Sequence, residues 1–139
     1  CGNYSFLKIN SLTITGTALG YSCCPAGYVS VGSECEKCVP GKYSTTSYST
    51  SCTDCEPGKY SVENATIACT DCEIGRASAH LGLGKRCPIC EAGKYQDEEG
   101  KSSCTECPVG TYLKDNSTVA LDHINGEKNC SVCVKVYSS

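Results

Sequence analysis

Hydrophobic and polar positions alternate over only short stretches of this chain, and no window of eleven or more residues has helical periodicity. The clearest alternation lies in residues 6–15, Phe-Leu-Lys-Ile-Asn-Ser-Leu-Thr-Ile-Thr, where β-branched residues are frequent, so we expect a β-strand there. Elsewhere, short Ser-, Thr- and Val-rich stretches, such as those beginning at Tyr43 and Tyr60, predict the strand arms of small irregular hairpins. The pattern therefore predicts mostly coil with short β-structure.

A cysteine-anchored unit recurs along residues 23–133. In most copies an opening Cys is followed by a Pro, a Gly and then a Tyr, as in Cys38-Val-Pro-Gly-Lys-Tyr43, and later copies open at residues 55, 72, 90 and 107. Pro restricts φ and Gly permits a tight turn, so each copy has its own turn signal. Tyr is the bulky side chain of each unit, and we expect it to cover the disulfide of its own or the neighbouring module.

This repetition predicts an elongated array of about six single-disulfide modules in which each module touches only its neighbours. An N-terminal β segment, residues 1–22, precedes the array, and residues 134–139 form a tail or the start of another repeat. The modules span residues 24–35, 38–52, 55–69, 72–87, 90–104 and 107–130.

The fourth module departs from the pattern. Ala77 and Ser78 stand where a Tyr is expected, and Gly82 and Gly84 loosen the arm that follows. We therefore expect altered packing and a bend in the array at this module.

The composition supports a disulfide scaffold. Fifteen of the 139 residues are Cys, whereas Met and Trp are absent and Phe occurs once, so large apolar side chains are too few for a conventional core. This excludes an ordinary two-layer enzyme domain of this length. The net charge of −3 and the lack of a Lys/Arg cluster argue against nucleic-acid binding. No apolar run is long enough to predict a membrane span, and without a charged segment preceding an apolar one we expect a mature or excised chain.

The C-x-x-C pairs that join the modules allow two interpretations. Their spacing is near that of zinc ribbons, and six pairs could supply three tetrathiolate sites. A four-Cys site consumes two pairs, however, so its chemical repeat would be about 34 residues, whereas the turn signature recurs after 17 or 18. One disulfide per module explains the observed period better. A thioredoxin-like redox role is disfavoured because no βαβ pattern is present.

These C-x-P-G-x-Y…C-x-x-C units resemble the ephrin-receptor-like cysteine-rich repeat and the first half-module of tumour-necrosis-factor-receptor cysteine-rich domains. The resemblance covers roughly residues 23–133. It implies that the Cys opening each module pairs with the Cys opening the next C-x-x-C, which gives Cys24–Cys35, Cys38–Cys52, Cys55–Cys69, Cys72–Cys87, Cys90–Cys104 and Cys107–Cys130. Persistent disulfides imply an oxidising compartment, so we expect an extracellular or cell-surface location.

Three cysteines remain after this pairing. A Cys1–Cys23 bridge would hold the N-terminal strand, and Cys133 is then unpaired or pairs with another chain. Four Asn-x-Ser/Thr sequons predict N-linked glycans at Asn3, Asn64, Asn116 and Asn129.

Catalysis finds no support in the sequence. His80 and His123 lie in separate variable loops without a recognisable nucleophile, and the acidic stretch 97–100 is better interpreted as a solvated turn than as a Ca²⁺ site. We expect no cofactor and no resident metal.

Two binding functions remain open. The rod of repeats, the strand at one end and the unmatched Cys133 at the other favour a structural glycoprotein that assembles with itself head to tail into a filament, appendage or surface coat. In that assembly residues 6–15 would pair with the alternating stretch 132–137 of the next subunit. The alternative is the stalk or ligand-binding ectodomain of a cell-surface receptor, as in the families that the repeats resemble.

Overall fold

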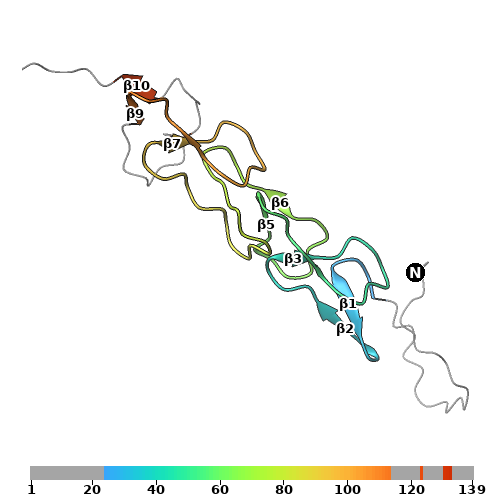
Figure 1. Ribbon diagram of the computed structural model, residues 1–139. Helices are drawn as coiled ribbons and strands as arrows, with labels where there is room; N and C mark the ends of the chain where they lie inside the picture. Colours follow the sequence, from blue (N-terminus) through green and yellow to red (C-terminus); the bar gives the residue numbers. More distant parts are fainter. Residues whose placement is uncertain (1–23, 114–122, 124–129, 133–139) are drawn as a thin grey trace, which may run out of the picture.

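The computed structural model describes residues 24–113, 123 and 130–132. These residues form a thin rod without an α-helix, in which short strands and long connecting loops follow one another from end to end (Figure 1). The expected strand at residues 6–15, together with Cys1, Cys23, Cys133, Asn3, Asn116 and Asn129, lies outside the described residues.

Each strand pairs with one other strand, and each pair forms a two-stranded antiparallel sheet. The first module has the longest hairpin, β1 (Tyr28–Val31) with β2 (Glu34–Lys37). The other pairs are β3 (Lys42–Tyr43) with β4 (Thr53–Asp54), β5 (Lys59–Tyr60) with β6 (Thr70–Asp71), β7 (Lys94–Tyr95) with β8 (Thr105–Glu106), and β9 (Thr111–Leu113) with β10 (Cys130–Val132). The structure is therefore the expected array of small disulfide-rich modules with short β-structure.

A glycine turn opens each module. In the second module the Lys42 N–H donates to the Val39 carbonyl at 3.0 Å, and Gly41 has a φ of +85°. Pro at the second position and a positive-φ Gly at the third are the signature of a type II turn. The chain leaves this turn directly into β3, so the Cys-x-Pro-Gly sequence sets the start of the hairpin.

The strands are shorter than the sequence predicts, because the arms after the tyrosines are not strands. The buried Ser44 donates its backbone N–H to the Thr66 carbonyl of the third module at 3.1 Å, and its hydroxyl bonds to Ser49. Ser61 repeats the pattern and donates to the Leu83 carbonyl at 3.1 Å. The hairpin ladder stops at Tyr because the backbone beyond it bonds to the following module.

Consecutive modules share several backbone hydrogen bonds. Between the second and third modules, Gly41 N–H donates to the Ser61 carbonyl at 2.9 Å, and Ala65 N–H donates back to the Cys38 carbonyl at 2.8 Å. The same two bonds recur one module later, between Gly58 and Ser78 and between Gly82 and Cys55, each at 2.8 Å. Each junction is thus held from both sides.

Contacts also extend to the second neighbour. A Cβ placed on Gly27, Gly41 or Gly58 would lie 2.1, 2.2 or 2.1 Å from the carbonyl oxygen of Ala65, Gly82 or Gly100, respectively. These contacts join the first module to the third, the second to the fourth and the third to the fifth. The expectation that each module touches only its neighbours is therefore wrong. The reason is that the turn glycine has no side chain, so a loop from two modules ahead packs directly on its backbone.

The loops that make these contacts turn at a left-handed corner. Tyr48, Ala65, Gly82 and Gly100 occupy equivalent places in four successive modules, with φ of +68°, +58°, +67° and +70°. Gly82 therefore supplies the backbone conformation that this corner requires. The expectation that it loosens the arm is wrong. Gly84 is also packed, because a Cβ there would lie 3.1 Å from the Pro40 carbonyl oxygen. The fourth module continues the line of the rod, and the expected bend is not seen (Figure 1).

Candidate functional site

A ladder of disulfides forms the interior of the rod. The structure contains Cys24–Cys35, Cys38–Cys52, Cys55–Cys69, Cys72–Cys87, Cys90–Cys104 and Cys107–Cys130, with Cα–Cα separations of 5.5–5.8 Å. These are the pairs that the family resemblance implied. The opening cysteines of the first four modules are completely buried, so sulfur takes the place of a hydrocarbon core. Within the described residues no group of three or more His, Cys, Asp and Glu side chains is arranged to hold a metal ion.

Tyrosine packs over the disulfide of the next module, as Tyr60 shows. Its ring lies against Leu83 and the Cys72–Cys87 bridge, and its hydroxyl donates to Glu73 Oε1 at 3.1 Å. Burial raises the pKa of Tyr60, and the hydrogen bond to Glu73 adds to this shift. Tyr60 therefore links its own hairpin to the following disulfide.

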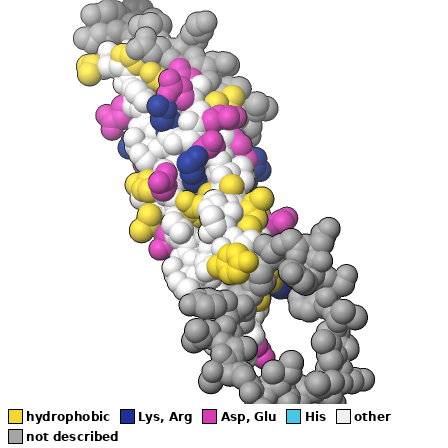
Figure 2. All heavy atoms as spheres, turned by 90° about the vertical axis from the view of Figure 1, so that its right-hand side faces the viewer, with side chains coloured by type: hydrophobic (Ala, Val, Ile, Leu, Met, Phe, Trp, Pro, Cys, Tyr) yellow, Lys and Arg dark blue, Asp and Glu magenta, His cyan; other side chains and the backbone are white. Residues whose placement is uncertain are grey.

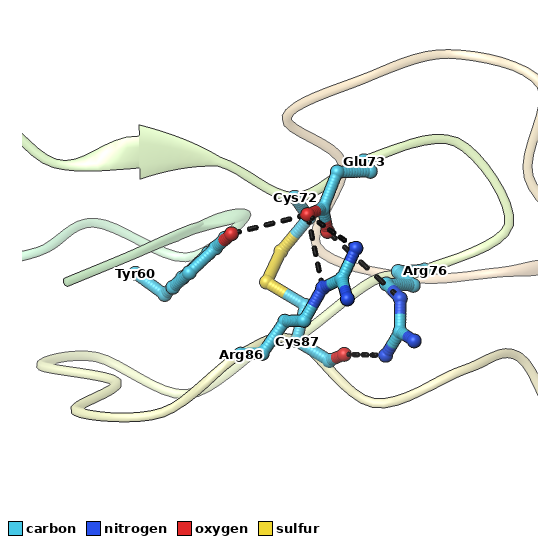
Figure 3. Close-up of polar contacts among 6 residues, drawn as sticks. All are labelled: Tyr60, Cys72, Glu73, Arg76, Arg86 and Cys87. Atoms are coloured by element: carbon cyan, nitrogen blue, oxygen red, sulfur yellow. Dashed lines mark hydrogen bonds and ion pairs between the residues drawn. A yellow bond between two sulfur atoms is a disulfide. The ribbon is translucent and has the colours of Figure 1, made fainter. Parts of the chain in front are cut away.

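Glu73 is the centre of a polar cluster around that disulfide (Figure 3). Arg86 reaches Glu73 Oε1 through two nitrogens, Nε at 3.0 Å and Nη2 at 2.8 Å, and Arg76 donates from Nη1 to the Cys87 carbonyl at 2.6 Å. Burial alone disfavours the charged form of Glu73, but the hydrogen bonds from Arg86, the backbone and Tyr60 outweigh it and lower the pKa of this carboxyl. The cluster therefore joins Tyr60 of the third module to the disulfide-bonded loop of the fourth module.

The second, third and fifth modules carry a lysine–acid pair across the hairpin. Lys42 Nζ lies 2.6 Å from Asp54 Oδ1, and Lys59 makes the same pair with Asp71. The hydrogen bond to Asp71 raises the pKa of Lys59. These pairs are half-exposed, so they fix the hairpin register more than they stabilise the fold.

Sequence reasoning missed this ladder of pairs, although its signal was present. A Lys follows the turn glycine and an acidic residue precedes the next opening Cys in three modules, the third pair being Lys94 with Glu106 at 3.8 Å. In the fourth module Arg76 and Ile89 occupy these places and form an isolated bridge. The fourth module is therefore unlike its neighbours in both its aromatic and its charged positions.

The remaining candidate residues are spread along the rod. His80 is exposed, whereas His123 is buried, with its Nδ1 2.6 Å from the Lys94 carbonyl oxygen. Asn64 is exposed on the loop next to the left-handed residue Ala65. Among the described residues, these candidates lie in different modules and do not form one site.

The surface carries both signs of charge, interspersed with small groups of hydrophobic side chains (Figure 2). No large field of one sign is present on this face. Among the described residues, no helix has the length and apolar character needed to cross a bilayer.

Comparison with known families identifies the type of module. Residues 75–121, roughly a third of the chain, match the model of the family described as tyrosine-protein kinase ephrin type A/B receptor-like. No curated protein matches the chain significantly. This family consists of small disulfide-rich repeats and is not a class of enzyme. The matched segment and the series of disulfide-bonded modules fit a cysteine-rich repeat of the ephrin-receptor-like type.

Proposed function

We propose that this chain is a stiff extracellular spacer, a structural rod that holds the parts at its two ends apart. The observation that carries this proposal is the interlocking of the first five modules, each of which contacts both a first and a second neighbour. The carbonyl of Gly82, for example, packs on Gly41 two modules away, while the Gly82 amide donates to Cys55 in the adjacent module. A hinge between two modules would have to break both sets of contacts.

The compartment follows from the chemistry of the ladder. Six disulfides over residues 24–130 persist only in an oxidising environment, and the ephrin-receptor-like repeat is an extracellular type of module. The exposed position of Asn64 is compatible with an N-linked glycan on the side of the rod. Both points favour a receptor-like ectodomain or an extracellular coat over any intracellular role.

A finer version of the proposal is self-assembly into a filament or coat. It is favoured by the sequence of the ends, where residues 6–15 and 132–137 both alternate and are β-prone and Cys133 has no assigned partner. Pairing of one end with the other would make a heterologous contact, which propagates when it does not close. The stalk of a receptor-like ectodomain needs no such contact.

Electron microscopy of the oxidised native chain in negative stain tests the proposal. Thin rods of uniform length support the spacer, and long polymers that shorten after deletion of residues 1–15 or in Cys133→Ser support the filament. Compact particles would overturn both. Electrophoresis with and without reductant shows in addition whether chains are joined through disulfides.

A further inference from the structure

A hollow lies beside Ala77, where the tyrosine of the fourth module is missing. Its volume is about 330 Å³, compared with about 220 Å³ beside Tyr60 and about 170 Å³ beside Tyr43. It therefore reaches the lower end of the range for ligand-binding pockets. The residues that line it include Ala77, Ser78 and His80 on one side and Cys90, Glu91 and Cys104 on the other.

The third module shows which group fits such a place. Ala77 occupies the position of Tyr60 in the repeat, five residues after the opening Cys. Tyr60 covers the Cys72–Cys87 disulfide of the following module, and the corresponding disulfide next to Ala77 is Cys90–Cys104, which lines the hollow. No tyrosine of the repeat occupies the corresponding place at this module, where Cys104 is partly exposed beside the hollow while Ala77 and Cys90 are buried.

The polar partner of the tyrosine is also present. Tyr60 donates its hydroxyl to Glu73, the residue directly after an opening Cys, and the residue in that place next to the hollow is Glu91. The Glu91 side chain is 85% exposed, so its carboxylate is accessible to an incoming hydroxyl. Its nearest charged partner is Lys94, whose Nζ lies 3.7 Å from Glu91 Oε2. The hollow therefore offers both halves of a tyrosine site, a disulfide and small side chains for the ring and a carboxylate for the phenol.

We propose that this hollow binds a tyrosine side chain presented by a partner protein. The ring lies over the Cys90–Cys104 disulfide against Ala77, and the phenol hydroxyl donates to Glu91. Aromatic anchors that fill a pocket and keep a polar end hydrated are common at the centres of protein interfaces. The site lies on the side of the rod, so it is independent of what the ends of the rod join.

The test is a titration of the full oxidised chain with N-acetyl-tyrosinamide, followed by amide and side-chain NMR shifts. We expect saturable shifts confined to residues 77–80, 88–94 and 102–104, with a dissociation constant in the millimolar range, on the order expected for one side chain. N-acetyl-phenylalaninamide, or the variant Glu91→Gln, should bind about three- to tenfold more weakly, because a hydrogen bond to a charged group is lost or weakened.

Two variants decide between this site and a non-specific hollow. Ala77→Tyr restores the repeat pattern, so it should fold with all loops oxidised and lose tyrosinamide binding. Tyr60→Ala should create a second site beside Cys72–Cys87 and Glu73. The proposal is overturned if the chain shows no saturable shifts, if Ala77→Tyr binds as well as the native chain, or if oxidised Tyr60→Ala gains no site.

Discussion

The contact between second-neighbour modules can be isolated by comparing two glycine substitutions. Gly58 and Gly93 occupy the same place in the opening turn, with φ of +85° and +79°. A Cβ on Gly58 would lie 2.1 Å from the Gly100 carbonyl oxygen, whereas a Cβ on Gly93 would meet no atom within 4 Å. Replacement by Ala therefore imposes the same backbone strain at both sites, and a clash with the second neighbour at only one.

The expected magnitudes follow from these two effects. A left-handed conformation costs an L-residue about 1–2 kcal/mol, and both variants bear this cost. The Gly58→Ala variant must also displace backbone in the fifth module, and overpacking of this kind costs about 1–3 kcal/mol more. We therefore expect the local opening free energy to fall by about 1–2 kcal/mol in Gly93→Ala and by about 2–5 kcal/mol in Gly58→Ala.

Native-state hydrogen exchange is the appropriate assay because the modules can open locally. Two amides are matched for the comparison, since Cys72 donates to the Gly58 carbonyl and Cys107 to the Gly93 carbonyl, at 2.8 and 2.9 Å. Exchange at Cys72 in Gly58→Ala should accelerate about 5- to 150-fold more than exchange at Cys107 in Gly93→Ala. The amide of Gly100 should accelerate as well, although it lies two modules away. Equal effects at the matched amides, with Gly100 unchanged, would refute the second-neighbour contact.

Three further results are expected from the same assay. Because the pKa of Glu73 is lowered, its carboxylate contributes fully to the opening free energy above the ordinary carboxyl pKa of about 4.3, and this contribution is lost as the pH falls through the lowered pKa. Exchange in residues 72–87 should therefore accelerate over that pH range. The variant Glu73→Gln should remove this pH dependence. Ala65→Gly should raise the opening free energy at the junction with the second module by up to about 1 kcal/mol and so slow exchange there, because Ala65 has a positive φ that Gly adopts without strain. Gly82→Ala should have the opposite effect and accelerate exchange, since the new Cβ would lie 2.8 Å from Asp54 Oδ1. Loss of one disulfide in the double variant Cys55→Ser/Cys69→Ser should lower the opening free energy of the third module by about 3 kcal/mol. Exchange should then accelerate in the two modules before it and the two modules after it. Acceleration in the directly adjacent modules alone would contradict the interlocked packing.

The repeat period and the turn residues were enough to predict the modules. An opening Cys, a Pro-Gly turn and a Tyr define a short hairpin without reference to distant parts of the chain. The covering of a disulfide by Tyr60 also follows from this local pattern, because Tyr60 is the aromatic side chain of its module.

The second-neighbour contacts could not be predicted in this way. They join residues about 40 positions apart, such as Gly58 and Gly100, while the sequence repeats every 17 or 18 residues. The left-handed corner could not be predicted for a related reason. Gly82 and Gly100 indicate it in two modules, but Tyr48 and Ala65, which rarely adopt this conformation, occupy it in the other two. An L-residue in this conformation is recognised only once the hydrogen bonds that hold the corner are known.

The tyrosine site beside Ala77 illustrates a third limit. The sequence shows that the fourth module lacks its Tyr, and loosened packing was the natural expectation. The structure instead keeps the module ordered through Leu83, the Glu73 cluster and the Gly82 corner, and leaves the hollow intact. The place of the missing tyrosine is thus a defined hollow, because other contacts hold the residues that line it in position.

Small-angle X-ray scattering of chains with different numbers of modules tests the rod most directly. Deletion of residues 55–71 removes one period and leaves both ends and the C-x-x-C joint unchanged, and a duplication of the same residues adds one period. The rod predicts that the maximum dimension falls and rises by equal steps, with a radius of gyration well above the value of about 14 Å for a compact chain of this length. A maximum dimension that does not change with the number of modules would contradict the interlocked rod.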